Sequence, residues 1–427
     1  MCAAMDKPAE NNITMRPARI FTLGCRLNQA DSALLTDRLR QLGYYVQGND
    51  EKTAPELIII NSCAVTAAAA AKSRQAARKL QNLYPAARIV FTGCAAEVDS
   101  CNIANEKWLK LGNVQKRDLA SALLHAPELI RSRDIKVENF AEKAVGLFPH
   151  RTRAFIKIQE GCDNFCSYCI VPYTRGASRS RDFNEVINDC RQAISSGAPE
   201  IIITGVNTCN YSDSGHDLCS VIETLCQSIP GTWRLRLSST EPALDNLALL
   251  ETMAKYPNKV CRFLHLALQH GCDSVLKRMN RHYSTKDFEK FVTTARKLIP
   301  DIHLGSDIIA GFPGESEEEF SESFEFVKQM RFANLHVFSY SKRAGTPAAV
   351  MADQVPDAVK KLRHQQLEAL GEVMKNDFRN SLQNRTLPVI FETVDRQGIA
   401  HGWSDNYIAV SAAANSVQPG KITWITI

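Results

Sequence analysis

The hydrophobic positions in the first part of the chain form short apolar runs that alternate with longer stretches of helical composition. The strand-length runs are 18–23, 57–61 and 88–92, and the helical stretches are 28–42 and 65–83. The second helical stretch is rich in Ala, Lys, Arg and Gln, which favour helix. Because strands that alternate with helices predict a parallel sheet, we expect an open parallel α/β domain over residues 17–127.

A second alternating series covers residues 148–378. Its six strand-length apolar runs are 154–160, 200–206, 234–239, 263–269, 302–310 and 334–340. The intervals between the runs leave room for a helix after each strand. Six strand–helix units are too few to close an eight-stranded barrel, so the pattern predicts a partial, open (β/α)6 barrel.

The remaining segments differ in character. Residues 128–147 are polar and charged with little periodicity, which predicts a linker. Residues 379–427 are β-rich, and Gly398, Gly402 and Gly420 mark turns between the apolar runs. This C-terminal pattern predicts a small β-barrel, and we expect the whole chain to be of the α/β class.

Composition and charge narrow the class of protein. Hydrophobic residues make up 44% of the 427 residues and charged residues 23%, as is usual in globular proteins. The net charge of +5 permits an acidic partner without requiring one. The longest apolar runs are strand-sized, and residues 1–17 lack the pattern of a secretory signal. We therefore expect a cytoplasmic protein that has no membrane partner.

The chain has fourteen cysteines, and in a reducing compartment clustered cysteines indicate metal binding or catalysis. Cys162, Cys166 and Cys169 directly follow the first predicted barrel strand, at the end where parallel barrels place their chemistry. Three thiolates on one loop can hold three corners of an iron–sulfur cube and leave the fourth iron open. A structural zinc site would need a fourth ligand, and no His or Cys follows Cys169 at zinc-finger spacing.

Three further cysteines follow the three predicted strands of the N-terminal domain. They are Cys25, Cys63 and Cys94. The carboxyl ends of parallel strands line one crevice, so these thiols can converge and hold a second cluster. Free cysteines are also among the most buried residues, and position alone leaves three structural cysteines as an equal alternative.

The segment 161–169, with three and then two residues between its cysteines, resembles the radical SAM superfamily. The resemblance implies that Cys162, Cys166 and Cys169 are the catalytic ligands of a 4Fe-4S cluster. S-adenosylmethionine (SAM) would bind the open iron, and its reductive cleavage would give methionine and a 5′-deoxyadenosyl radical. Tyr168 occupies the position that packs near the adenine in this superfamily.

The segments 22–28, 61–66 and 92–94 resemble the N-terminal domain of the methylthiotransferases within that superfamily. The resemblance implies that Cys25, Cys63 and Cys94 are metal ligands of an auxiliary 4Fe-4S cluster that takes part in delivering sulfur. It also implies two uses of SAM, as methyl donor and as radical source.

Three other segments, 72–75, 151–162 and 338–348, are similar to one branch of that family. This branch adds a methylthio group to C2 of N6-threonylcarbamoyladenosine beside the anticodon of tRNA. The alternatives are the branches that act on isopentenyladenosine in tRNA or on a ribosomal-protein aspartate, and a non-catalytic, metal-stabilised RNA-binding protein. The implied partners are the tRNA anticodon stem-loop, an electron donor such as flavodoxin or ferredoxin, and a sulfur donor.

The resemblance also implies a set of residues that bind SAM. They are Gly205, Asn207, Ser239, Glu241, Ile309 and Gly311, each of which could equally be a turn or packing residue. The arginines of the segment 173–181 could grip SAM or the RNA backbone, or form a solvated basic surface. They are Arg175, Arg179 and Arg181, and Arg179 is the one expected to contact the cofactor.

The remaining candidates receive structural interpretations. His265 and His270 are predicted to face opposite sides of one strand, which excludes a joint ligand pair. The other cysteines form no compact cluster and are expected to be packing or surface thiols, with Cys209 nearest to a strand end. They are Cys2, Cys101, Cys190, Cys209, Cys219, Cys226, Cys261 and Cys272. The C-terminal β-rich segment resembles the small RNA-binding TRAM barrel, with about one strand too few.

Overall fold

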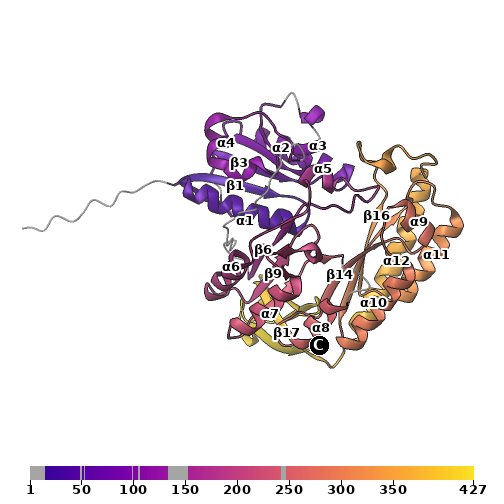
Figure 1. Cartoon of the computed structure of the whole chain (residues 1–427). Helices are drawn as coiled ribbons and strands as arrows, with labels where there is room; N and C mark the ends of the chain where they lie inside the picture. The colour runs from indigo at the N-terminus through magenta and orange to yellow at the C-terminus, as the bar shows by residue number, and fades with distance from the viewer. Residues whose placement is uncertain are drawn as a thin grey trace, which may run out of the picture.

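The computed structural model describes residues 15–48, 51, 53–98, 100–103, 106–132, 152–241 and 247–427. These residues form an N-terminal parallel sheet, a partial parallel barrel and a C-terminal antiparallel sheet (Figure 1). The predicted α/β fold class is confirmed. The predicted linker at 128–147 lies outside the described residues from residue 133 onward.

The N-terminal sheet is parallel throughout, in the order β2-β1-β3-β4-β5. Its strands are β1 (Arg16–Thr22), β2 (Tyr44–Val46), β3 (Leu57–Ser62), β4 (Arg88–Gly93) and β5 (Leu109–Leu111). Its helices are α1 (Arg26–Gln41), α2 (Ala67–Leu83), α3 (Cys94–Val98) and α4 (Leu119–His125). The sequence predicted β1, β3 and β4 but missed β2 and β5, since three residues are too few to show a period.

The strand order of this sheet creates a crevice at the carboxyl ends of β1 and β3. The chain leaves β1 toward β2 on one side and leaves β3 toward β4 on the other. Loops that diverge at such a switch point open a ligand-binding crevice. Cys25 and Cys63 follow these two strands, so the topology places both thiols beside that crevice.

The barrel consists of two parallel sheets, in the orders β12-β9-β6 and β13-β14-β15-β16. Its strands are β6 (Arg153–Lys157), β9 (Glu200–Thr204), β12 (Arg234–Leu237), β13 (Ser239–Thr240), β14 (Phe263–Gln269), β15 (His303–Ala310) and β16 (Asn334–Ser339). The helices on its outer side are α6 (Phe183–Ser195), α7 (Leu218–Ser228), α8 (Ala248–Lys255), α10 (Thr285–Leu298), α11 (Glu317–Met330) and α12 (Asp357–Ser381). Every predicted barrel strand is present.

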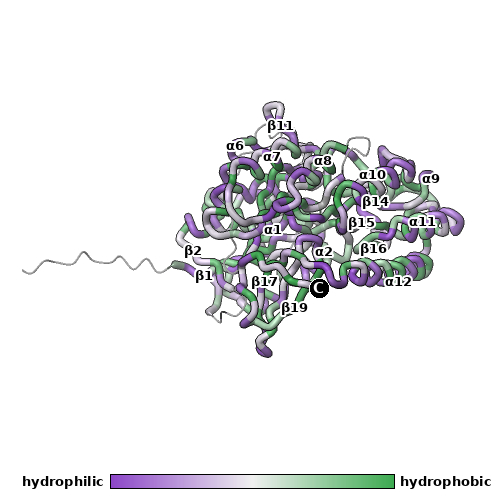
Figure 2. Tube along the Cα trace, turned by 90° about the horizontal axis from the view of Figure 1, so that it is seen from below, coloured by the Kyte–Doolittle hydropathy of each residue, from purple (hydrophilic) through white to green (hydrophobic). Residues whose placement is uncertain are grey.

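The largest hydrophobic core lies between the barrel strands and the outer helices. Leu264 and Leu266 of β14 and Leu304 of β15 pack there against Phe291 of α10. Figure 2 shows hydrophilic positions recurring along the exposed side of α12. Because side chains alternate along a strand, the neighbours of these leucines point to the opposite, inner face of the barrel.

The C-terminal sheet is antiparallel, in the order β19-β18-β17-β20, and curls into a half-barrel. Its strands are β17 (Thr386–Val394), β18 (Ile399–Ser404), β19 (Ala409–Ala413) and β20 (Ile422–Thr426). Arg236 of β12 is buried and donates hydrogen bonds to the carbonyls of Ser404 and Asp405, 3.0 and 2.8 Å away. These bonds dock the half-barrel beneath the parallel barrel (Figure 1).

Helix α1 joins the N-terminal sheet to the barrel. Leu35 and Leu39 pack on the sheet, whereas Ala30 packs against Phe155 of β6 and Ile202 of β9. Within the described part of the chain, no helix is both long enough and apolar enough to cross a bilayer.

Candidate active site

The barrel cysteines lie in an irregular loop between β7 (Gln159–Glu160) and α5 (Val171–Arg175). Gly161 has a φ of 75°, and a Cβ atom at this position would overlap the carbonyl of Ala177, so the loop requires glycine there. Burial, with a contribution from the neighbouring Cys166, raises the pKa of Cys162 to about 11 and that of Cys169 to about 12. The structure therefore brings the three predicted thiols together.

The N-terminal cysteines converge from three separate strand ends. Burial raises the pKa of Cys63 to about 12, and the charges of Cys94 and Cys25 contribute to the same shift. Gly24 touches Cys63 so closely that a Cβ atom on this glycine would lie 2.7 Å from the sulfur. The second predicted triad is therefore also a cluster in space.

The sulfur atoms of each triad are spaced too widely to bind one zinc ion together. Among the described residues, neither triad has its three sulfur atoms all within 4.8 Å of one another. Two thiolates on one zinc ion, at Zn–S distances of about 2.3 Å, can be at most about 4.6 Å apart. The wider spacing disfavours a zinc ion and leaves room for a larger iron–sulfur cube. Because metal ligands must be deprotonated, binding a cluster at these thiols would release protons.

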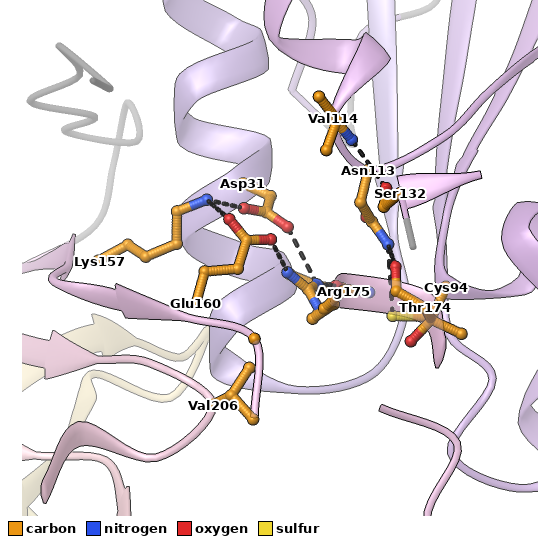
Figure 3. A network of polar contacts seen from close by, with 12 residues as sticks. Asp31, Cys94, Asn113, Val114, Ser132, Lys157, Glu160, Thr174, Arg175 and Val206 are labelled. Carbon is orange, nitrogen blue, oxygen red and sulfur yellow. Dashed lines mark hydrogen bonds and ion pairs between the residues drawn. The ribbon is translucent and has the colours of Figure 1, made fainter. Parts of the chain in front are cut away.

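A buried network of ion pairs joins the N-terminal domain to the barrel (Figure 3). Asp31 of α1 lies 2.6 Å from Lys116 Nζ, 2.6 Å from Lys157 Nζ and 3.1 Å from Arg175 Nη2. Glu160 lies 2.8 Å from Arg175 Nη1. All five side chains are at most 4% exposed. Glu160 directly precedes the cysteine loop, so the network reaches the root of the barrel triad.

Cationic side chains surround the two carboxylates of this network. In the described residues, Asp31 and Glu160 pair with five cationic side chains, namely Lys116, Lys157, Arg117, Arg175 and Arg179. Burial raises the pKa of each carboxyl group. Lys116, Lys157 and Arg175 outweigh burial at Asp31, and Lys157, Arg117 and Arg175 do so at Glu160, so both carboxyl groups keep a pKa well below the usual range.

Arg175 and Asn113 carry the network to the N-terminal triad. Arg175 donates a hydrogen bond to Asn28 Oδ1 at 2.7 Å. The side chain of Asn28 in turn donates to the backbone carbonyl of Ser62, directly before Cys63, and to that of Leu23, directly before Gly24. Asn113 Nδ2 lies 3.8 Å from Cys94 Sγ and 2.9 Å from the carbonyl of the residue before Arg175 (Figure 3). Barrel and N-terminal domain therefore share one set of polar contacts at the thiols.

No pattern in the sequence predicts this network. Asp31 is 144 residues from Arg175 and 126 from Lys157, so only the fold brings them together. The one available signal was Glu160, a carboxylate inside an apolar strand directly before a cysteine loop.

Three of the predicted SAM contacts lie in or beside the cysteine loop. Tyr168 is part of the loop and packs against an apolar cluster that contains Ile309. Glu241 Oε1 accepts a hydrogen bond from Asn164 Nδ2 at 3.0 Å and pairs with Arg281 at 2.9 Å. Arg281 also donates to Cys166 Sγ at 3.2 Å. The sequence had not singled out Arg281, whose guanidinium lies against a cluster thiol.

Gly205 and Asn207 lie in the loop after β9, which Gln159 ties to the cysteine loop. Gln159 Oε1 accepts from the backbone N–H groups of Val206 and Asn207, and its Nε2 donates to the carbonyl of Gly161. The Asn207 side chain caps its own turn, accepting from the N–H two residues on. Gly205 leaves space for Gln159, since a Cβ atom there would lie 3.0 Å from Gln159 Oε1.

The last two predicted SAM contacts lie on other strands. Gly311 follows β15 at a φ of 74°, and a Cβ atom there would overlap Lys360 of α12. Its N–H donates to Glu315 Oε2 at 2.8 Å. Ser239 lies in β13, opposite His265 of β14, and its side chain lies outside the described part.

Of the two interpretations of these arginines, the solvated basic surface is excluded for Arg175 and Arg181, because both are buried. Arg181 pairs with Asp189 at 2.8 Å and donates to the carbonyl of Lys157. Arg179 donates to the carbonyls of Arg175 and Ala177. All three arginines thus hold the loops around the cysteines.

The remaining thiols are packing residues where the structure describes them. Cys190, Cys226, Cys261 and Cys272 are buried, and Cys209 and Cys219 pack against the main core. Cys2 and the side chain of Cys101 lie outside the described residues. His270 is buried, accepts from the N–H of Cys272 and lies 3.5 Å from Glu315, as expected of a structural histidine.

The chain is similar to known proteins over most of its length. Residues 156–327 match the Radical SAM superfamily, and residues 18–111 match the Uncharacterized protein family UPF0004. The chain is 34% identical to the threonylcarbamoyladenosine tRNA methylthiotransferase MtaB of Bacillus subtilis, over 97% of this chain and 94% of that one. It is 32% identical to the tRNA-2-methylthio-N(6)-dimethylallyladenosine synthase of Desulfitobacterium hafniense, over 89% of this chain and 88% of that one.

A solved structure supports the fold. The radical S-adenosylmethionine methyltransferase TsrM from Kitasatospora setae, with cobalamin and a [4Fe-4S] cluster bound, aligns with a TM-score of 0.58 at 14% identity. The alignment covers 79% of this chain and 77% of that one.

Proposed function

The chain belongs to the radical SAM tRNA methylthiotransferases, enzymes that use SAM and 4Fe-4S clusters, and we propose that it modifies C2 of N6-threonylcarbamoyladenosine beside the anticodon. Relatives named for this substrate are 32–36% identical to the chain. The isopentenyl-type substrate is the second candidate, because a relative named for dimethylallyladenosine is 32% identical.

We assign the two clusters to the two triads. Cys162, Cys166 and Cys169 would hold the cluster that binds SAM, and the N-terminal triad would hold the auxiliary cluster. Adenine C2 carries an unactivated C–H bond that no acid–base side chain can break, so a radical generated from cluster-bound SAM supplies this chemistry.

The side chains of the chain position and shield these groups. Arg281 donates to Cys166 Sγ, so its positive charge lies against a proposed cluster ligand. Tyr168 and Ile309 offer an apolar surface for a purine ring. Gly205, Asn207, Ser239, Glu241, Gly311 and Arg179 remain proposed contacts of SAM.

The partners of the reaction follow from the same assignment. A tRNA anticodon stem-loop is the proposed substrate, with the C-terminal half-barrel as its proposed contact. An unpaired base would be bound by backbone charge and stacking. An electron donor such as flavodoxin or ferredoxin and a sulfur donor complete the proposed set.

The observation that carries the proposal is the shared network, in which Arg175 of the barrel contacts Asn28 of the N-terminal domain between the two triads. The test incubates the reconstituted protein with SAM, a reductant and tRNA that carries either N6-threonylcarbamoyladenosine or isopentenyladenosine. Digestion and mass spectrometry should show a gain of roughly 46 Da, for SCH₃ replacing H, on the threonylcarbamoyl nucleoside.

The matched control replaces Cys162, Cys166 and Cys169 together by alanine. Iron should fall from about eight to about four per chain, since one of two four-iron clusters is lost, and product should disappear. A wild-type count near four, or a mass gain on the isopentenyl nucleoside alone, would contradict the proposal.

A further inference from the structure

Three strands of the barrel each contribute one ligand-type side chain to the same inner face. His265 lies on β14, Asp307 on β15 and His336 on β16. The residues next to them in the strands pack outward against the main core, and they are Leu264, Leu266, Ile308, Leu335 and Val337. Because side chains alternate along a strand, His265, Asp307 and His336 point inward. Two residues beyond Asp307, on the same face, Ile309 belongs to the small apolar cluster against which Tyr168 of the cysteine loop packs.

The three side chains converge closely. His265 Nε2 lies 2.8 Å and His336 Nδ1 3.2 Å from the same oxygen of Asp307, Oδ1. The three ligand atoms all lie within 4.8 Å of one another, and among the described residues this is the one such set of three. Burial raises the pKa of Asp307, but the hydrogen bonds from both imidazoles outweigh it and keep the carboxyl ionised.

The surrounding backbone makes room for this cluster. Gly305, opposite His265 in the register of β14 and β15, carries no side chain. A Cβ atom there would lie 2.8 Å from His265 Nδ1, so any larger residue would displace the imidazole. His336 is 54% exposed at its side chain, which leaves the cluster open to solvent on one side.

We propose that His265, Asp307 and His336 bind a divalent transition-metal ion, with zinc as the representative, separately from the two cysteine triads. Two imidazoles and one carboxylate on rigid strands are a ligand set that takes Zn²⁺ or Fe²⁺ and leaves a coordination position open. The open position would face the exposed side of His336, inside the barrel. The ion would replace the two hydrogen bonds that now join the imidazoles to Asp307. This inference does not depend on the identity of the tRNA substrate.

The test uses the full-length protein with both iron–sulfur clusters reconstituted. The protein is equilibrated with Zn²⁺ and a competing chelator, and zinc, iron and sulfide are counted per chain by mass spectrometry and colorimetry. We expect one zinc per chain. Zinc X-ray absorption fine structure should show nitrogen and oxygen ligands at about 2.0–2.1 Å and no sulfur at about 2.3 Å.

His336→Gln and Asp307→Asn should each weaken zinc binding at least tenfold without changing the iron count. His401→Gln is the matched control, because His401 lies 3.0 Å from Asp395 in an exposed His–Asp pair of the C-terminal half-barrel. This control should bind zinc like the wild type. A sulfur shell, absence of zinc from the wild type, or equal binding by His336→Gln would overturn the proposal.

Discussion

Asp31 of α1 and Arg175 of the barrel form a buried ion pair of 3.1 Å although 144 residues separate them in the chain. Arg175 lies six positions after the third barrel cysteine, and Asp31 lies six positions after the first N-terminal cysteine. The pair therefore fixes the two cysteine loops relative to each other. Changes at this pair should affect both domains at once.

Replacing Asp31 by asparagine should destabilise the protein strongly. Lys116 would lose the carboxylate with which it pairs, and Lys157 and Arg175 would each lose one of theirs. Breaking a buried ion pair costs about 3–5 kcal/mol. Urea denaturation measures the change. Asp37→Asn on the same helix is the control, because its partly exposed pair with Arg40 should contribute at most about 1 kcal/mol. Equal losses in the two variants would show that the network does not stabilise the fold.

The same network predicts a loss of stability in acid. The folded-state pKa of Asp31 and of Glu160 lies below its ordinary value, so their contribution is fully present above that value. It is lost as the pH falls through the ordinary range near about 4 toward the lower folded-state pKa. The melting temperature should therefore drop between about pH 5 and pH 3, and Asp31→Asn should flatten this drop. An equally steep drop in that variant would assign the pH dependence to other groups.

Gly24→Ala should remove the N-terminal cluster selectively. Gly24 has a φ of 94°, and a Cβ atom there would lie 2.7 Å from both Cβ and Sγ of Cys63, so the thiol must move. Anaerobic iron analysis should fall from about eight to about four per chain. Gly43→Ala is the matched control, since its φ of 78° imposes a similar backbone strain with no atom within 4 Å of the new Cβ. Full iron in Gly24→Ala would contradict the assignment of Cys63 as a ligand.

Arg281 should tune the barrel cluster through its 3.2 Å contact with Cys166 Sγ. Arg281→Met removes a positive charge beside a thiolate ligand, so the reduction potential should become more negative by tens of millivolts. Arg281→Lys keeps the charge and should restore part of the shift. Redox titration monitored by electron paramagnetic resonance measures both variants. An unchanged potential in Arg281→Met would limit the residue to its pair with Glu241.

Much of this protein follows from local patterns in its sequence. The six barrel strands were predictable because each is an apolar run bounded by turn residues, and the barrel cysteines because their close spacing needs no tertiary contact to interpret. The N-terminal cysteines were harder, since Cys25, Cys63 and Cys94 meet only if the three strands share a parallel sheet. Strand order places them together.

The charged residues could not be assigned in the same way. Arg175 and Arg181 look like surface residues in a basic segment, yet both are buried because carboxylates outside that segment, Asp31 and Asp189, neutralise them. His265 gave no sign of its partners, since Asp307 and His336 lie on two other strands. Short-range patterns therefore determined most of the helices and strands and grouped the barrel cysteines. Tertiary structure decided the convergence of the N-terminal cysteines, the pairing of the buried charges and the histidine cluster. Electrostatic contacts depend on separation in space, which the order of residues alone does not contain.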